Sequence, residues 1–272
     1  MGAYRGRGGP GYRTYGGGFG WLLTPVVKKL IIANAAVFVL TFLLQVFSRP
    51  LAVSFISLFG LVPQGFLFEF RLWQPLTYLF LHASLMHLLF NMLGLWMFGA
   101  PLERDWGGRR FLRYYLLTGV GAGLFSVLVT ALVVKLGWMA GRGGEALLVP
   151  TIGASGAIYG ILLAFGLLYP STPIYIWFLF PVPARVFVFI FGAIAFLSAL
   201  QGPGTGVSHV AHLGGMLFGY VYLRGGLRGL WHRARLRYAD WRMQQARRKF
   251  EVYMRDQDEP ERHDARPNQW IN

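Results

Sequence analysis

The chain has 272 residues, of which 55% are hydrophobic and only 14% are charged, and its formal net charge is +15. A typical soluble domain carries about 25% charged residues, so this composition argues against an ordinary soluble protein. The positive charge does not indicate a nucleic-acid partner, because no basic face with base-reading residues accompanies it. Cysteine is absent, which excludes disulfides, thiol chemistry and cysteine-based metal sites.

The N-terminal segment, residues 1–26, is basic and rich in glycine and tyrosine, and we expect a disordered cytoplasmic tail. We expect no secretory signal peptide there, because the segment lacks an apolar core and a cleavage site. Long uncharged runs follow, and a helix needs about 20 apolar residues to cross a bilayer. The runs are too uniformly apolar for barrel strands, which alternate at period two. They predict six transmembrane helices, at 27–47, 84–101, 110–134, 152–168, 184–200 and 207–224.

The fold class is therefore an all-α, polytopic membrane helical bundle, with one membrane domain at 27–224. Segment 50–77 is broken by proline and glycine, and we expect a long non-cytoplasmic loop with short interfacial helices. The connection 135–150 predicts a mobile loop outside the membrane. The basic cytoplasmic tail, 225–272, contains a stretch at 227–254 that predicts either a helix on the anionic leaflet or a solvated helix.

The placement of basic residues predicts the orientation of the bundle. Residues 1–29 hold five Lys/Arg and no acid, and the tail from Arg224 holds twelve against seven acids. Because positive charge favours the cytoplasmic side, both termini are expected there, which requires an even number of spans. We expect an integral multi-pass protein of a bacterial inner membrane.

Polar residues inside the predicted spans gather at three helix starts. Such residues are costly in a bilayer, so each is a functional hypothesis. By the predicted topology all three starts lie at one depth, near the non-cytoplasmic face. The residues are His82, His87 and Asn91 in the second span, Ser155 and Tyr159 in the fourth, and His209 and His212 in the sixth.

This set fits acyl transfer at a serine. A serine hydroxyl needs a base to remove its proton, and an imidazole suits that task. His87, Asn91 and the backbone N–H of Ser155 could donate hydrogen bonds to an oxyanion, and Gly153 would let another segment approach closely. No Asp or Glu occurs between residues 146 and 239. The sequence therefore favours a Ser155–His212 dyad over a triad, with the ring of His212 packed against Tyr159.

Other interpretations of these residues stay open. The small residues of 153–160 could form a helix-packing seam, and Gly215 and Gly219 predict such a seam between the sixth span and the fourth. A metal transporter could use the four histidines of the spans. A non-catalytic protein that binds membrane helices is a third possibility.

Four motifs resemble those of the rhomboid intramembrane serine proteases. They are GASGAIYG at 153–160, AHLGGMLFG at 211–219, HASLMHLLFN at 82–91 and GAPLERDWG at 99–107. The resemblance implies a serine endopeptidase with Ser155 as nucleophile and His212 as base and then acid. It also implies that His87 and Asn91 help to bind the oxyanion.

The same resemblance implies single-pass or other transmembrane protein substrates with helix-destabilising residues near the cut. We expect no cofactor, and no metal, because the spans near the histidines lack Asp and Glu. We expect membrane lipids as further partners and no nucleic acid, and the sequence leaves the oligomeric state open. One departure is visible: family members often carry Trp-Arg in the first loop, where this chain has Trp73-Gln74, with Arg71 two residues before Trp73.

Overall fold

The computed structural model describes residues 23–137, 143–176, 179–200, 209–225 and 242–245. The chain divides into two compact units, Met1–Gly219 and Tyr220–Asn272. In the second unit the structure describes only the end of the last helix and a helical turn at 242–245. The first unit carries the candidate site. The predicted tail 1–26 and the predicted helix 227–254 lie almost wholly outside the described residues.

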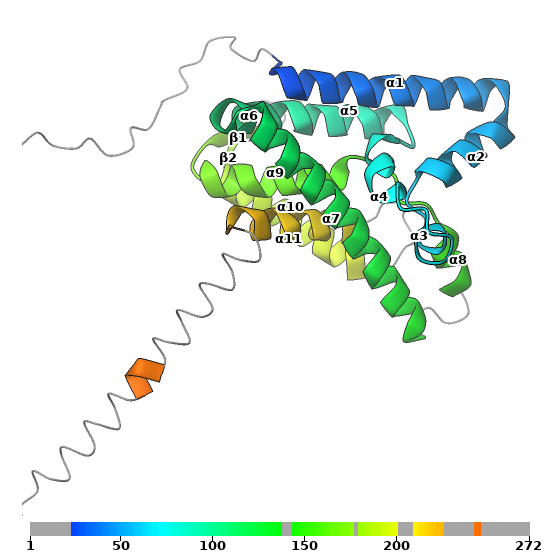
Figure 1. Ribbon diagram of the computed structural model, residues 1–272. Helices are drawn as coiled ribbons and strands as arrows, with labels where there is room; N and C mark the ends of the chain where they lie inside the picture. The colour runs from blue at the N-terminus through cyan, green and yellow to red at the C-terminus, as the bar shows by residue number, and fades with distance from the viewer. Residues whose placement is uncertain (1–22, 138–142, 177–178, 201–208, 226–241, 246–272) are drawn as a thin grey trace, which may run out of the picture. The chain divides into compact units, whose positions relative to one another are not determined.

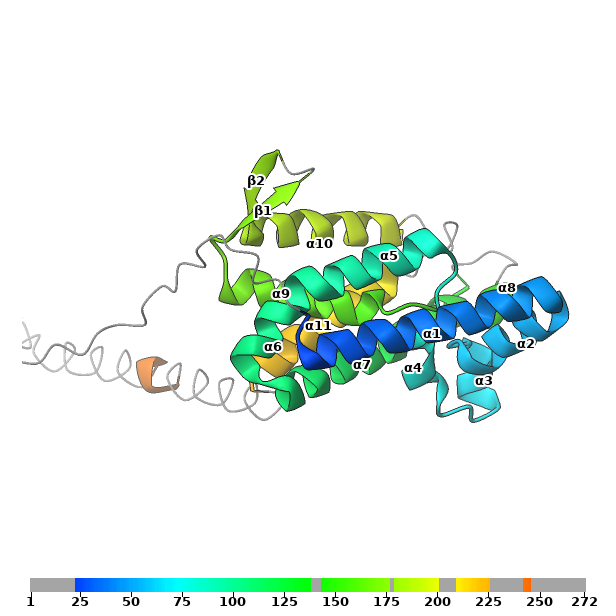
Figure 2. The same ribbon diagram turned by 90° about the horizontal axis from the view of Figure 1, so that it is seen from above.

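The first unit is a bundle of helices with one small β-hairpin (Figures 1 and 2). The elements in chain order are α1 (Pro25–Phe47), α2 (Arg49–Phe59), α3 (Pro63–Phe68), α4 (Gln74–Thr77), η1 (Tyr78–Phe80), α5 (Leu85–Gly94), η2 (Leu95–Gly99), α6 (Ala100–Trp106), α7 (Gly108–Lys135), α8 (Gly143–Leu148), α9 (Ser155–Leu168), β1 (Pro173–Ile176), β2 (Phe180–Pro183), α10 (Ala184–Leu200) and α11 (His209–Leu223). The prediction of a helical bundle is confirmed.

Three of the described helices are long and apolar enough to cross a membrane, namely Pro25–Phe47, Leu85–Trp106 and Gly108–Lys135. The second of these joins α5, η2 and α6, and it continues past Pro101, where the sequence predicted its end. A wider π-helical turn, η2, directly precedes this proline. Proline lacks a backbone N–H and would clash in a regular α-helix, so the wide turn lets the helix continue.

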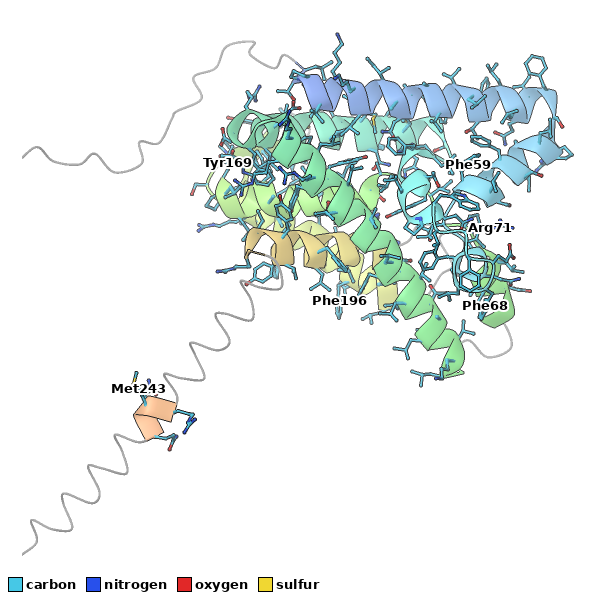
Figure 3. The ribbon with its side chains drawn as sticks, viewed as in Figure 1. Phe59, Phe68, Arg71, Tyr169, Phe196 and Met243 are labelled. Carbon is cyan, nitrogen blue, oxygen red and sulfur yellow. The ribbon has the colours of Figure 1, made fainter. Side chains whose placement is uncertain are left out.

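The outer surface of the bundle is apolar, as a membrane environment requires. Large hydrophobic side chains project from the helices in Figure 3. The side chains of Phe47, Phe189 and Phe90 are 83%, 75% and 69% exposed. Such an extended apolar surface would be unfavourable in water, and it fits contact with lipid.

Helix α9 lies in the middle of the bundle, in contact with α5, α7, η2 and α10. Its buried residues lie on all sides, which is typical of a fully enclosed helix. Helix α9 also packs on α11, at glycines that allow the two backbones to approach closely. A β-carbon at Gly215 would lie 1.8 Å from the carbonyl oxygen of Gly156, and one at Gly219 would lie 3.2 Å from the α-carbon of Gly160. The predicted packing seam is confirmed.

The start of α1 is fixed by a carboxylate from a distant helix. Pro25 occupies the first turn of α1, where its missing N–H costs nothing. Glu103 of α6 accepts hydrogen bonds from the backbone N–H groups of Val26 and Val27, at 2.8 and 2.9 Å, and from the hydroxyl of Thr24. A buried carboxylate satisfies unpaired N–H groups at a helix start and interacts favourably with the helix dipole.

The hairpin β1–β2 was not predicted. Its two four-residue strands are antiparallel, with Pro173 opposite Pro183 and Ile176 opposite Phe180. Pro173 and Pro183 lie at strand ends and Pro181 lies inside β2, and a missing donor is tolerated because both strands of a two-stranded sheet are edge strands. The stretch lies between the predicted spans 152–168 and 184–200, and such short, proline-flanked strands have no clear periodic signal.

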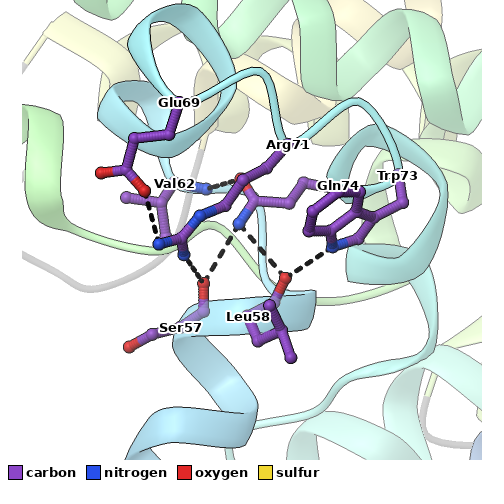
Figure 4. Close-up of polar contacts among 7 residues, drawn as sticks. All are labelled: Ser57, Leu58, Val62, Glu69, Arg71, Trp73 and Gln74. Carbon is purple, nitrogen blue, oxygen red and sulfur yellow. Dashed lines mark hydrogen bonds and ion pairs between the residues drawn. The ribbon is translucent and has the colours of Figure 1, made fainter.

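Segment 49–77 folds into the short helices α2, α3 and α4, so this part of the loop prediction is confirmed. Buried Gln74 anchors the loop (Figure 4). Its side-chain oxygen accepts from the backbone N–H of Val62 at 3.1 Å. Its amide nitrogen donates to the carbonyls of Ser57 and Leu58, at 3.1 and 3.3 Å.

Arg71 supplements this anchor. Its guanidinium donates to the carbonyl of Ser57 at 3.1 Å and forms an ion pair with Glu69 at 2.5 Å. The indole of Trp73 donates to the carbonyl of Leu58 at 2.9 Å. Gln74 and Arg71 thus share a carbonyl, so the absence of the Trp-Arg pair does not leave the loop without an anchor.

Candidate active site

Ser155 and His212 form the centre of the site. Ser155 is the first residue of α9, and His212 lies in the first turn of α11. The hydroxyl oxygen of Ser155 and Nε2 of His212 are 2.8 Å apart, although the two residues are 57 positions apart in the sequence. His212 is buried and Ser155 is half-buried. The close packing of the glycines of α9 and α11 brings the two helix starts together.

The ring of His212 is oriented by packing. The ring of Tyr159 stacks on it, with centroids 4.1 Å apart and planes at 5°. Nδ1 of His212 is buried and has no hydrogen-bond partner among the described residues. The sequence prediction of Tyr159 against His212 therefore agrees with the observed geometry. His209 contacts the edge of the His212 ring, at 5.7 Å between centroids.

His87 and Asn91 lie beside the turn that precedes Ser155. Gly153 in this turn has a φ of +120°, a conformation that favours glycine. A β-carbon at Gly153 would lie 2.7 Å from Nε2 of His87 and 3.8 Å from Nδ2 of Asn91. The missing side chain of Gly153 is therefore what allows the ring of His87 to approach the turn.

Both groups are available as hydrogen-bond donors. Nδ1 of His87 accepts from the backbone N–H of Ala83 at 3.4 Å, so in the neutral ring Nε2 carries the proton. Nδ2 of Asn91 is buried with no hydrogen-bond partner among the residues that the structure describes. Ser84 caps the start of α5 by accepting from the backbone N–H of His87 at 3.2 Å, which fixes this helix turn. An unpaired buried donor is costly, so a negatively charged oxygen at this point would be stabilised.

His82 lies behind His87 rather than in the site itself. It is buried, and its ring meets that of His87 edge-on, with centroids 4.9 Å apart. This packing limits the positions that the His87 ring can take. Within the described part of the chain, no group of three His, Asp or Glu side chains could hold a metal ion.

The turn before Ser155 is held by backbone contacts that the sequence analysis missed. Thr151 and Leu61 exchange two backbone hydrogen bonds, at 3.0 and 2.9 Å, and the N–H of Gly153 donates to the carbonyl of Tyr78 at 2.9 Å. Tyr78 is fully buried, and its hydroxyl donates to the carbonyl of Gly119 at 2.6 Å. No periodicity in the sequence marks such long-range backbone pairs. The loop that contains Gln74 is thereby connected to the site.

Comparison with known proteins identifies the region that contains these site residues. A family model described as Rhomboid domain matches residues 69–228, a stretch that contains every candidate site residue. The chain belongs to the rhomboid family.

Several relatives resemble this rhomboid chain over half or more of its length. Rhomboid protein 1, mitochondrial, of Saccharomyces cerevisiae is 33% identical over 53% of the chain and 38% of the relative. RHOMBOID-like protein 12, mitochondrial, of Arabidopsis thaliana is 32% identical over 70% and 55%. Rhomboid protease GluP of Bacillus subtilis is 28% identical over 66% and 31%. The chain thus spans only about a third to just over half of the length of these relatives.

The family and the apolar helices show a membrane protein. Two of these names are mitochondrial and one belongs to a bacterium, and another relative, from Arabidopsis thaliana, is named chloroplastic. Taken together, the names do not support the bacterial inner membrane that the sequence analysis expected.

Proposed function

We propose that this rhomboid is an intramembrane serine endopeptidase that hydrolyses peptide bonds in or near transmembrane segments. The observation that carries the proposal is the 2.8 Å contact between the hydroxyl of Ser155 and Nε2 of His212. Family membership supports it, since one relative is named a rhomboid protease. A nucleophile and a base within hydrogen-bond reach are the signature of an activated serine.

In the proposed mechanism, Nε2 of His212 accepts the proton of the Ser155 hydroxyl as the oxygen attacks the scissile carbonyl. His212 then donates this proton to the leaving amine, and an acyl-enzyme remains on Ser155. A water molecule, deprotonated by the same imidazole, attacks the ester and releases the new carboxyl end. His212 returns the proton to the Ser155 hydroxyl, which regenerates the free enzyme.

The oxyanion that forms in both steps would lie where three donors converge. These are Nε2–H of His87, Nδ2–H of Asn91 and the backbone N–H of Ser155, which lacks an intrahelical partner at a helix start. Donors that are already in place before the reaction stabilise developing charge without further reorganisation. No carboxylate is needed in this scheme, because Tyr159 holds the imidazole by stacking.

We further propose that six helices cross the membrane, with α9, α10 and α11 as the last three, and that both termini face the cytoplasm. The protease domain would then be 27–224, between the tails 1–26 and 225–272. Helix α9 has 14 residues and measures about 21 Å, whereas the hydrocarbon core is about 30 Å thick. If its C-terminal end reaches the cytoplasmic face, Ser155 lies below the opposite surface, where a polar cavity must admit water.

The proposed substrates are transmembrane proteins whose helix unwinds near the cut. An intact helix binds its own carbonyls, so the scissile bond becomes accessible only where the helix opens, and glycine or proline lowers that cost. The entry gate for the substrate is proposed to lie near Phe90 and the phenylalanines of α10, namely Phe187, Phe189 and Phe191. Phe187 stacks on Phe191 and also contacts Phe98 of η2. Phe189 lies on another face of α10, so among these three rings Phe187 is the one with a described contact to the second span.

The decisive test is labelling of the purified protein with a fluorophosphonate probe, followed by mass spectrometry of the labelled peptide. We expect label on Ser155 in the wild type and none in Ser155→Ala. A folded wild-type protein that takes up no label while Ser155 is accessible to the probe would favour a non-catalytic binder of membrane helices. Label on another serine would show that the nucleophile is misassigned.

A further inference from the structure

A groove with a volume of about 520 Å³ runs along the outer side of α10, between this helix and its neighbours α9 and α11. Leu163 of α9 and Met216 of α11 contribute to its floor. Arg185, Phe189, Gly192 and Phe196 follow one another along the wall formed by α10, with spacings that keep them on one helix face. Phe196, at the far end, is labelled in Figure 3.

The length of the groove matches one leaflet of a bilayer. From Arg185 to Phe196 the helix rises about 16 Å, at about 1.5 Å per residue. Half of the hydrocarbon core is about 15 Å, so an extended acyl chain of one leaflet would fit along the groove. Gly192 keeps the middle open: a β-carbon there would already approach the thioether methyl of Met216 to 3.3 Å.

The two ends of the groove differ in charge. Arg185 is the only charged residue that lines it, and its guanidinium makes no hydrogen bond or ion pair with any residue that the structure describes. The backbone N–H of Arg185 donates to the carbonyl of Pro170 at 3.2 Å, which fixes this residue at the start of α10. The sequence offers no Asp or Glu from residue 146 to residue 239. No carboxylate among the described residues pairs with this exposed guanidinium, so it is free to bind an anion from outside the bundle.

We propose that this groove binds an anionic phospholipid, with one acyl chain along α10 and the phosphate against the guanidinium of Arg185. Arginine suits phosphate, because its planar group forms two parallel charge-assisted hydrogen bonds. Basic pockets between transmembrane helices are a recurring type of anionic lipid site. The proposal concerns binding alone and holds whether or not Ser155 is catalytic.

The bound acyl chain would pack against the face of α10 that is turned away from the second span. Phe187, which stacks on Phe191, contacts Phe98 of η2 from a face of α10 roughly opposite to the one that carries Arg185 and Gly192. The lipid would thus fill the space on the side of α10 that faces away from the second span.

The test is native mass spectrometry of the full chain in a neutral detergent, titrated with phosphatidylglycerol or with phosphatidylcholine of the same acyl chains. We expect preferential retention of phosphatidylglycerol. Arg185→Gln should reduce this retention about fivefold and leave phosphatidylcholine unchanged. Arg109→Gln is the matched control, since Arg109 is also exposed but lies outside the groove, and it should bind both lipids as the wild type does.

Two further variants test the acyl-chain half of the proposal. Gly192→Leu and Ala193→Leu place a side chain in the groove and should reduce retention of both lipids, and Ala193→Leu decides if Gly192→Leu does not fold. The proposal is overturned if Arg185→Gln retains phosphatidylglycerol like the wild type, or if folded groove-filling variants bind as before. A dimer or a bound peptide in place of lipid in the same spectra would also overturn it.

Discussion

Gly215 of α11 packs directly on Gly156 of α9, so closely that a β-carbon at Gly215 would lie 1.8 Å from the Gly156 carbonyl oxygen. This contact lies one residue from Ser155 on one helix and three residues from His212 on the other. Because the obstructing atom belongs to the backbone, a larger residue can be accommodated only by separating the helices. The hydrogen bond between Ser155 and His212 therefore depends on a glycine that takes no part in the chemistry.

Replacing Gly215 by alanine should impair both stability and catalysis. Overpacking costs about 1–3 kcal/mol of unfolding free energy, and the shift of α11 moves His212 away from Ser155. We expect a lower unfolding temperature and greatly reduced cleavage of a transmembrane reporter. Gly144→Ala is the control, since nothing lies within 4 Å of a β-carbon there. Normal activity in Gly215→Ala would mean that the two helices can separate without breaking the dyad.

Replacing Gly153 by alanine should damage the oxyanion donors. The new methyl group would lie 2.7 Å from the ring of His87, and the backbone would remain at an unfavourable φ of +120°. Gly107→Ala is a matched control, because Gly107 has a φ of +77° with open space around its β-carbon position. Both variants suffer backbone strain, of about 1 kcal/mol or more. Only Gly153→Ala should lose kcat, and equal losses in both would remove the role assigned to the approach of His87.

Asn91→Ala should lower kcat about a hundredfold to a thousandfold, which is the usual effect of removing one oxyanion donor. KM should change little, because the donor acts mainly on charge that develops in the transition state. Asn34→Ala provides a comparison, since Asn34 is also a buried asparagine but donates to the carbonyl of Leu30 within α1. It should affect stability alone. If Asn91→Ala keeps its kcat, Nδ2 is not an oxyanion donor.

Gln74→Ala should destabilise the fold more than Arg71→Ala does. Gln74 is fully buried, and its removal leaves the N–H of Val62 without its acceptor, at about 1–3 kcal/mol. Arg71 and Trp73 still bind the carbonyls of Ser57 and Leu58. Arg71 is partly exposed, and its ion pair with Glu69 contributes little in such a setting. Chemical unfolding gives the free energy of unfolding of each variant. A larger loss in Arg71→Ala than in Gln74→Ala would show that Arg71 is the main anchor.

The long uncharged apolar runs of the sequence located most of the helices of the bundle. The range 184–200 agrees with α10 because Arg185 and the prolines before it mark its start, and the seam of Gly215 and Gly219 was recognised from spacing alone. The hairpin could not be predicted, because strands of four residues are too short to show a clear alternating pattern. The same holds for the backbone bonds between Thr151 and Leu61, which join segments far apart in the chain.

The structure places the residues proposed for the site close together, and their catalytic roles stay predictions. Ser155 and Tyr159 are four residues apart on one face of α9, a spacing that the sequence shows, and His212 lies on α11. The resemblance of the motifs to those of the family suggested the role of each residue. Two features could not be read from the sequence: Nδ2 of Asn91 has no hydrogen-bond partner among the described residues, and Arg185 is the one charged residue among those that line its groove. Which polar groups lack a partner is known only when the packing of the helices is known.

The measurement that tests the dyad most directly is the initial rate of reporter cleavage by the purified wild type and by Ser155→Ala, His212→Ala and His209→Ala, each shown to be folded. We predict no cleavage by the first two variants and measurable cleavage by His209→Ala, because it is His212 that contacts the Ser155 hydroxyl at 2.8 Å. Wild-type rates in Ser155→Ala or His212→Ala, or a loss confined to His209→Ala, would contradict the assignment of Ser155 and His212 as nucleophile and base.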